Sequence, residues 1–352
     1  GFMSNYWTNY RSILTAAGHT PKTIFDQPGN HDHWLDTGLS NYKKHSIQGK
    51  ATGATHHAWT LQLPFGDYHF VGLDTSSGSL SPSEKSWALA QLTAGAGARQ
   101  SMLFGHHPLS SIDSGGSFRQ ALANEKALAY FFGHNHKASA STRTWTSGGV
   151  LLWIGQTLGK PLSTLGEAEF CVVALDNDGL SVRPFDLGFS GGSYQLKWPA
   201  VQITAPLDLG LGGSGQNPYA YPVSSAAKDN PIRALVFSDT APYQVTASVD
   251  NSAPFGLKQV TPGGALWEGT FDGALLGSGV THTLSVTASA GSNSDTHTIT
   301  FKASATTACS DAQDNDGDKL VDFPADPGCS GLFDSDERDP PALIVIPDAG
   351  LG

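Results

Sequence analysis

Three short motifs bring together residues that can bind a metal ion. They are Gly29-Asn-His-Asp32, Gly105-His-His-Pro108 and Gly133-His-Asn-His136, and eleven of the thirteen histidines lie between His19 and His136. Imidazole nitrogens and an amide oxygen are borderline ligands, which suit Zn, Mn or Fe better than Ca. Each motif starts with a glycine, which lets the backbone turn sharply and approach a ligand closely. The motifs therefore predict a transition-metal centre.

The elements before the motifs are expected to position these side chains. Short apolar stretches precede all three motifs, at residues 23–25, 101–104 and 128–132, and each is predicted to be a strand. Ligands of α/β sheets bind outside the carboxyl ends of the strands, so the side chains are expected to meet at one edge of a sheet. The candidates are Asn30, His31, His106, His134 and His136.

The first two hundred residues alternate helical and extended patterns. Apolar spacing predicts helices over 4–17 and 118–126, and Ser81-Pro-Ser-Glu84 is typical of a helix start with a capping box. Alternation predicts a hairpin from 57–63 and 68–73 and strands near 150–154, 170–175 and 180–184. We therefore expect residues 1–199 to form a layered α/β domain.

The pattern changes near residue 200. Helical periodicity ends, and short alternating runs predict a β-sandwich of about a hundred residues, over 200–305. The runs are residues 232–237, 243–249, 265–271, 283–288 and 296–301. The inter-sheet cysteines of antibody domains are missing.

An acidic segment follows the predicted sandwich. Ten of the 31 acidic residues lie between Cys309 and Asp339. Four of them stand at spaced positions that resemble Asp-rich calcium loops, although Lys319 and the missing twelfth-position Glu depart from the EF-hand. The candidate calcium ligands are Asp314, Asp316, Asp318 and Asp322. The alternative is a solvated acidic linker, and residues 341–352 are expected to be a linker or tail.

The three cysteines indicate the compartment. Cys309 and Cys329 bracket most of the acidic segment and are predicted to form a disulfide, whereas Cys171 is predicted to be a buried thiol. A disulfide implies an oxidising compartment, so we expect a secreted or cell-surface protein, extracellular or periplasmic.

Charge and hydropathy exclude several classes of protein. Charged residues make up only 14% of the chain and the net charge is -11, which argues against a nucleic-acid scaffold. Hydrophobic residues make up 39%, as in an ordinary globular protein. No apolar run approaches the roughly 18 residues of a membrane span.

The order of the three motifs resembles the calcineurin-like metallophosphoesterases. The resemblance implies two divalent or trivalent metal ions, Mn, Fe or Zn, that bind phosphate and activate a bridging water. It implies that Asn30, His106 and His134 bind one ion and that His136 binds the other. His106 is preferred to His107 as the ligand, because the family ligand follows the strand directly.

The resemblance also implies two catalytic residues. His31 would lie near the leaving oxygen as a general acid or as a donor in the transition state. Asp32 would orient His31 from behind.

Three further stretches are similar to the transmembrane-protein-62-like branch, in which an Ig-like domain follows the phosphoesterase domain. They are residues 63–74, 197–199 and 231–238, and the resemblance covers about residues 1–305. It implies an α/β (α+β) metallophosphoesterase sandwich, followed by an all-β Ig-like sandwich. The small Asp-rich module expected at 306–340 lies beyond the resemblance.

One departure from the family concerns the upstream ligands. The family uses an Asp-x-His and a Gly-Asp motif before the Asn-His-Asp motif, but this chain has only His19 and Asp26 there. Two cations without the bridging carboxylate repel each other with too little compensating charge. We therefore expect the phosphoesterase domain to be N-terminally incomplete here, since a start at Gly1 is not a natural one.

These patterns lead to two function hypotheses. The first is a metal-dependent phosphoesterase that hydrolyses a phosphomonoester, phosphodiester or pyrophosphate bond. The alternative is a non-catalytic extracellular binding or adhesion protein with a degenerate phosphoesterase domain. A zinc peptidase is a weaker third, because the chain has no His-Glu-x-x-His motif. The substrate, the metal and the oligomeric state stay open.

Overall fold

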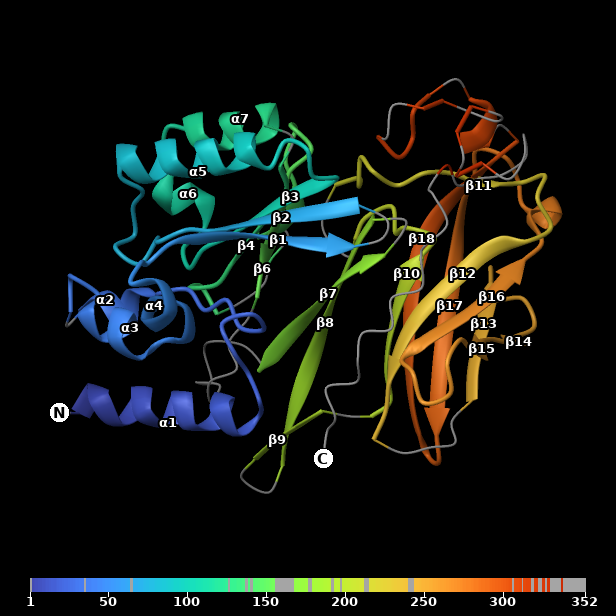
Figure 1. Ribbon diagram of the computed structural model, residues 1–352. Coiled ribbons are helices and arrows are strands. Elements are labelled where there is room, and N and C mark those ends of the chain that lie inside the picture. Colours follow the sequence, from blue (N-terminus) through green and yellow to red (C-terminus); the bar gives the residue numbers. More distant parts are fainter. Residues whose placement is uncertain are drawn as a thin grey trace. The chain divides into compact units, whose positions relative to one another are not determined.

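A computed structural model of the 352-residue chain shows a mixed α/β protein that is largely β-rich, with few helices (Figure 1). The chain forms two compact units, Gly1–Thr157 with Pro161–Gly166, and Leu158–Lys160 with Glu167–Gly352. The structure describes residues 2–34, 36–63, 66–125, 127–136, 139, 142–155, 168–176, 179–190, 193–196, 198–211, 215–239, 244–305, 307–311, 313–317, 320–321, 325–326, 328–329 and 337.

Among these residues, no helix has both the length and the apolar character that a membrane crossing requires.

The first unit contains a six-stranded mixed sheet with the strand order β1-β2-β3-β4-β6-β5. The inner strands β2, β3, β4 and β6 are parallel, and β1 and β5 pair antiparallel at the two edges. The parallel strands end at the same edge, which is the arrangement that the motifs need. The strands are β1 (His57–Leu63), β2 (Gly66–Gly72), β3 (Gln100–Phe104), β4 (Ala127–Phe132), β5 (Arg143–Trp145) and β6 (Leu151–Ile154).

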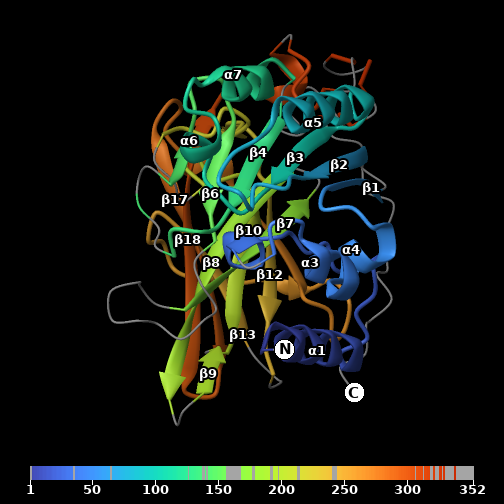
Figure 2. The same ribbon diagram turned by 90° about the vertical axis from the view of Figure 1, so that its left-hand side faces the viewer.

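Helices lie on both sides of this sheet, with α5, α6 and α7 on one side and α1 to α4 on the other (Figure 1 and Figure 2). Buried side chains of α5 and α7, including Leu92 and Leu122, join Val71 and Leu103 of the strands in one apolar core. The helices are α1 (Phe2–Ala16), α2 (Asn30–Trp34), α3 (Ser40–His45), α4 (Ile47–Thr52), α5 (Pro82–Ala94), α6 (Leu109–Ile112) and α7 (Ser117–Asn124).

The predicted start of α5 is confirmed. Ser81 is the N-cap, its Oγ accepts a hydrogen bond from the backbone N of Glu84 at 3.1 Å, and Pro82 is the first helical residue. Only half of the capping box forms, because Glu84 Oε1 accepts from the backbone N of Asp74 at 3.1 Å instead.

The strand predicted over 23–25 is wrong. This segment has no strand structure, and side chains of α3 and α4 take its backbone carbonyls. Gln48 Nε2 donates to the carbonyl of Ile24 at 2.6 Å, and Tyr42 Oη donates to the carbonyl of Asp26 at 2.7 Å. Since side chains from later in the sequence already satisfy these carbonyls, they are not available for a ladder with a neighbouring strand.

The second unit contains two sheets that share a core. One has the order β10-β12-β16-β15 and the other β11-β18-β17-β13-β14. Alternate residues of both sheets are buried together, such as Ile232 and Ala234 against Leu284, Val286 and Phe301. The strands are β10 (Ala200–Ala205), β11 (Val223–Ser224), β12 (Asn230–Phe237), β13 (Gln244–Val249), β14 (Phe255–Gly256), β15 (Lys258–Gln259), β16 (Leu266–Phe271), β17 (Thr281–Ala290) and β18 (Asn293–Ser304), with 3-10 turns η1 (Gly273–Leu275) and η2 (Ala308–Ser310).

A third sheet, β7-β8-β9, also belongs to the second unit. Arg183 of β8 forms a bidentate ion pair with Asp295 of β18, with both N···O distances at 2.8 Å. The predicted boundaries after residues 199 and 305 stay predictions. The strands are β7 (Glu169–Asp176), β8 (Gly179–Ser190) and β9 (Ser193–Leu196).

The predicted disulfide between Cys309 and Cys329 is present. Cys171 is a free thiol, as expected, but it is only partly buried, so the prediction of a buried thiol is wrong. Its Sγ lies 3.6 Å from Glu169 Oε1 on the same strand, because residues two apart in β7 project to the same face.

Candidate metal centre

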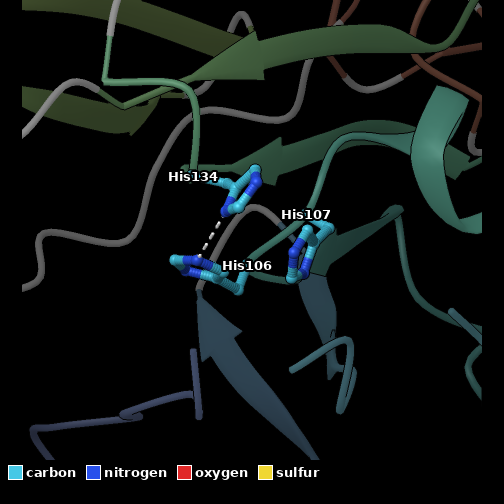
Figure 3. A group of neighbouring side chains, drawn as sticks. All are labelled: His106, His107 and His134. Carbon is cyan, nitrogen blue, oxygen red and sulfur yellow. Dashed lines mark hydrogen bonds between the residues drawn. The ribbon is translucent and has the colours of Figure 1, made fainter. Parts of the chain in front are cut away.

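Two neighbouring parallel strands deliver the histidines of the candidate metal centre. Gly105, His106 and His107 directly follow β3, and Gly133 and His134 follow β4. The strand pairing continues into these loops, because Gly105 N donates to Phe131 O and Gly133 N donates to His106 O, each at 3.0 Å. The imidazoles of His106, His107 and His134 consequently lie together at one edge of the sheet (Figure 3).

Asn30, the first residue of α2, also reaches this cluster. Its Oδ1 lies 2.8 Å from His106 Nε2, and the same nitrogen lies 3.2 Å from His134 Nδ1. The close approach depends on Gly29, because a Cβ there would stand 3.0 Å from His106 Nδ1. Three residues that are far apart in the sequence thus aim donor atoms at one point.

His107 is held by hydrogen bonds to Thr75 and Tyr130. The backbone nitrogens of His106 and His107 donate to Thr75 Oγ1 at 2.7 and 3.0 Å. The His107 ring nitrogen Nδ1 lies 2.5 Å from the carbonyl of Thr75, and Tyr130 Oη donates to the carbonyl of His107 at 2.6 Å. This buried scaffold positions the His-His pair.

Electrostatics keep the three imidazoles neutral at neutral pH. Burial, followed by the charges of His107 and His134, lowers the pKa of His106 to about 4. Burial and then His134 lower the pKa of His107, against the hydrogen bond that its ring donates to Thr75. Burial, His136 and His31 lower the pKa of His134. Metal ligation requires the neutral form of histidine, so these rings are in the form that a cation needs.

The donor set fits a divalent transition metal. One ring nitrogen from each of His106, His107 and His134 lies within 4.8 Å of the others. The 3.2 Å between His106 Nε2 and His134 Nδ1 is close to the edge of about 3.3 Å that follows from a tetrahedral Zn–N bond of about 2.0–2.1 Å. In the part of the chain that the structure describes, this cluster contains no carboxylate.

The remaining predicted residues lie beside this cluster. His31 is exposed on α2, with its ring centroid 4.4 Å from that of Trp34. Asp32 Oδ2 accepts from the backbone N of Gly29 at 2.8 Å and so caps α2. His136 follows His134 in the same loop, outside the three-histidine group. The expected roles of His31, Asp32 and His136 stay predictions.

The environment of Asp32 affects its titration. Burial raises the pKa of Asp32, while the bond from Gly29 and the nearby His31 act in the opposite direction.

Sequence reasoning missed His107 as a member of the group. The sequence signal for His107 was its place in the pair of histidines that follows β3. His106 was preferred because it stands closer to the end of that strand. The bonds to Thr75 decide the position of His107, and Thr75 stands 32 residues earlier in the chain.

The acidic segment has a second group of side chains. Asp326, Cys329 and Glu337 are buried and have oxygen or sulfur atoms within 4.8 Å of one another. Cys329 is in the disulfide, so its sulfur is not a thiolate ligand. Of the predicted calcium ligands, Asp314 Oδ1 accepts from Gly317 N at 2.7 Å.

Asp316 is also described but is not part of the buried group. Asp318 and Asp322 lie outside the described residues. The calcium prediction for all four carboxylates stays a prediction.

Comparison with known proteins finds no family. The chain matches no described protein family, and no curated protein is recognisably similar to it. Among solved structures, the endo-beta-1,4-mannanase from Thermotoga petrophila is similar at 9% sequence identity. The match covers 67% of this chain and 47% of the mannanase chain, with a TM-score of 0.23. An engineered protein is similar at 14% sequence identity. The match covers 67% of this chain and 49% of the engineered chain, also with a TM-score of 0.23.

The chain therefore spans about half the length of these two structures. Because both TM-scores are 0.23, neither likeness bears on the fold or the function of this chain.

Proposed function

We propose that this chain is a metal-dependent phosphoesterase, which cleaves a phosphomonoester, phosphodiester or pyrophosphate bond. The observation that carries the proposal is the convergence of Asn30 Oδ1, His106 Nε2 and His134 Nδ1, at 2.8 and 3.2 Å. These are the residues that the resemblance to calcineurin-like metallophosphoesterases implies for one ion. The same resemblance supports the assignment of the two-sheet core of the second unit to an Ig-like domain.

A bound cation would supply Lewis-acid activation of a phosphoryl oxygen and of the attacking water. The chain's own residues would position it. Asn30 Oδ1 only accepts, so without a metal His106 holds its proton on Nε2, and a cation would take the place of that proton. His31 is exposed and adjacent to Asn30 in α2, where its ring is accessible to a leaving oxygen as a proton donor. Asp32 holds the first turn of α2, and with it Asn30 and His31, through its bond to Gly29 N.

Hydrolysis of a chromogenic phosphate ester in the presence of Zn²⁺ or Mn²⁺ tests this proposal. We expect the rate of hydrolysis to fall at least about 100-fold in His134→Ala. Loss of a residue that only hydrogen-bonds to a metal ligand already lowers metal affinity or activity about 10–100-fold. His19→Ala is the matched control, because His19 is exposed and outside the cluster. Equal rates for all three proteins would contradict the proposal.

A non-catalytic binding protein is the second candidate. The described group of three histidines could hold an ion whether or not the chain hydrolyses a substrate. Metal uptake that depends on His134, together with no hydrolysis of monoester, diester or pyrophosphate substrates, would select this candidate.

We also propose that the acidic segment binds calcium outside the cell, in line with its disulfide. Asp314 and Asp316 would contribute oxygen ligands. Calorimetric titration of the full chain should show Ca²⁺ uptake at about millimolar concentration or below. No uptake would leave the segment as a solvated acidic linker.

A further inference from the structure

The orientation of His107 resembles that of a metal ligand. The carbonyl of Thr75 can only accept a hydrogen bond, so at 2.5 Å the proton of His107 lies on Nδ1 and the lone pair lies on Nε2. A ring N–H donated to a backbone carbonyl is the usual way in which proteins fix the tautomer of a metal-binding histidine. The residue is only 6% exposed, so this tautomer is held inside the fold.

No second partner competes for the His107 ring. Among the described residues, the hydrogen bond of the His107 ring is the one from Nδ1 to Thr75. Nε2 is not among the buried side-chain atoms without a partner, so it reaches solvent. Its lone pair is therefore open to a cation at the cluster.

The three rings are spaced as imidazoles around a single ion. Their centroids are 4.9 Å apart for His106 and His107, 5.2 Å for His106 and His134, and 4.1 Å for His107 and His134. Rings bound to one zinc through bonds of about 2.0–2.1 Å would have centroids about 5 Å apart. Figure 3 shows His106 and His134 turned toward each other, with His107 beside them.

We propose that His106, His107 and His134 bind one zinc ion, with Asn30 Oδ1 beside it, so that His107 is an additional ligand. Three neutral imidazoles suffice to bind a single zinc ion, and one ring nitrogen of each lies within 4.8 Å of the others. The inference rests on the proposed function only for the catalytic role of the ion, not for its binding.

Two variants of His107 separate ligation from folding. His107→Asn keeps a side-chain N–H near the position of Nδ1, and therefore the bond to Thr75, but it removes Nε2. His107→Gln places a polar atom near Nε2 but loses the bond to Thr75. His19→Ala is again the control. Circular dichroism and thermal unfolding without metal establish which proteins fold.

The test is titration of the full-length proteins with Zn²⁺ by calorimetry and with Co²⁺ by visible absorption, in excess Ca²⁺ to occupy the acidic segment. We expect one ion per wild-type chain, with the intense absorption of tetrahedral Co²⁺. In His107→Asn the affinity should fall at least about 10–100-fold, and His19→Ala should match the wild type.

Three results would overturn the inference: no zinc uptake by the wild type, two ions in the imidazole cluster, or unchanged affinity in a folded His107→Asn. In the last case a metal-dependent phosphoesterase remains tenable on Asn30, His106 and His134. Conversely, zinc binding that requires His107 but supports no hydrolysis would uphold the inference and reject the proposed function.

Discussion

Gly29 is the residue whose size most directly controls the candidate site. A methyl group at this position would stand 3.0 Å from Nδ1 and 3.1 Å from Cε1 of His106, so the ring must move by a few tenths of an ångström. We predict that Gly29→Ala weakens zinc binding about 10-fold, because ligand position determines affinity. Calorimetric titration measures the effect.

The matched control is Gly97→Ala, since a Cβ at Gly97 meets nothing within 4 Å. Equal affinity in Gly29→Ala and Gly97→Ala would show that the close approach to His106 does not matter.

His134 and His136 have left-handed backbone conformations, with φ of 70° and 56°. Such a conformation costs a residue with a Cβ about 1–2 kcal/mol. We predict that His136→Gly is about 1 kcal/mol more stable than His136→Ala, since both lack the imidazole and only alanine keeps the strain. Urea unfolding measures the difference, and a more stable alanine variant would refute strain at this loop.

At the scale of single residues, the sequence predicted part of the site. Asn30, His106 and His134 were expected to converge, and the structure brings their donor atoms together. The position of His107 was not predictable, because it depends on Thr75, which no motif singles out. The bond from Gly29 N to Asp32 was also not foreseen, since Asp32 was expected to face His31.

Periodicity predicted most individual elements correctly. The hairpin of β1 and β2 and the helix after Ser81 formed as expected, because alternation and capping are local signals. The error at residues 23–25 had a long-range cause. Side chains from 42 and 48 take the carbonyls of that segment, and a window of a few residues does not contain them.

Within the second unit, β17 carries an ion pair that makes stability depend on pH. His282 Nδ1 lies 2.6 Å from Asp250 Oδ2. Burial opposes the charged ring, but the bonds to Asp250 and Gly277 and the charge of Asp250 outweigh it and raise the pKa of His282. Burial likewise opposes charge on Asp250, but bonds from Thr283 and His282 lower the pKa of Asp250.

The signs define the pH range of this stabilisation. The contribution of His282 is complete below about pH 6.5 and is lost as pH rises through its raised pKa. The contribution of Asp250 is complete above about pH 4 and is lost as pH falls through its lowered pKa. The pair therefore stabilises the strand most between about pH 4 and 6.5.

We predict that His282→Gln costs about 1 kcal/mol more at about pH 5.5 than at about pH 8.5. Urea unfolding at both pH values measures the difference. His282→Asn is neutral as well, so the free energy of unfolding that it costs should depend on pH in the same way as for His282→Gln. A loss in His282→Gln that does not depend on pH would contradict the account.

For the whole molecule, the disulfide is the constraint that the sequence predicted and the structure contains. Cys309 and Cys329 are 20 residues apart, and closing a loop of this length stabilises by about 3 kcal/mol. We predict that the acidic segment becomes sensitive to proteases in the double variant Cys309→Ser/Cys329→Ser, while β12 and β17 stay protected. Limited proteolysis with mass spectrometry measures this. Equally fast cleavage of the acidic segment in the disulfide-bonded wild type would contradict the prediction.

The change of pattern near residue 200 predicted a β-rich second part, and the strands from β10 onward form two of the described sheets of the second unit. The hairpin of β7 and β8 precedes the predicted boundary at residue 199, which stays a prediction. The pairing of Arg183 with Asp295 joins β8 to β18, across 112 residues of sequence. Periodicity identifies such a hairpin but does not indicate its partner.

The most direct test of the account is anomalous X-ray diffraction from crystals of the full chain soaked in Zn²⁺. The account predicts one strong peak between His106 Nε2 and His134 Nδ1, about 2.0–2.1 Å from each and from a nitrogen of His107. A well-ordered cluster with no peak there, or with zinc bound elsewhere only, would contradict the claim that these strand ends form a metal site.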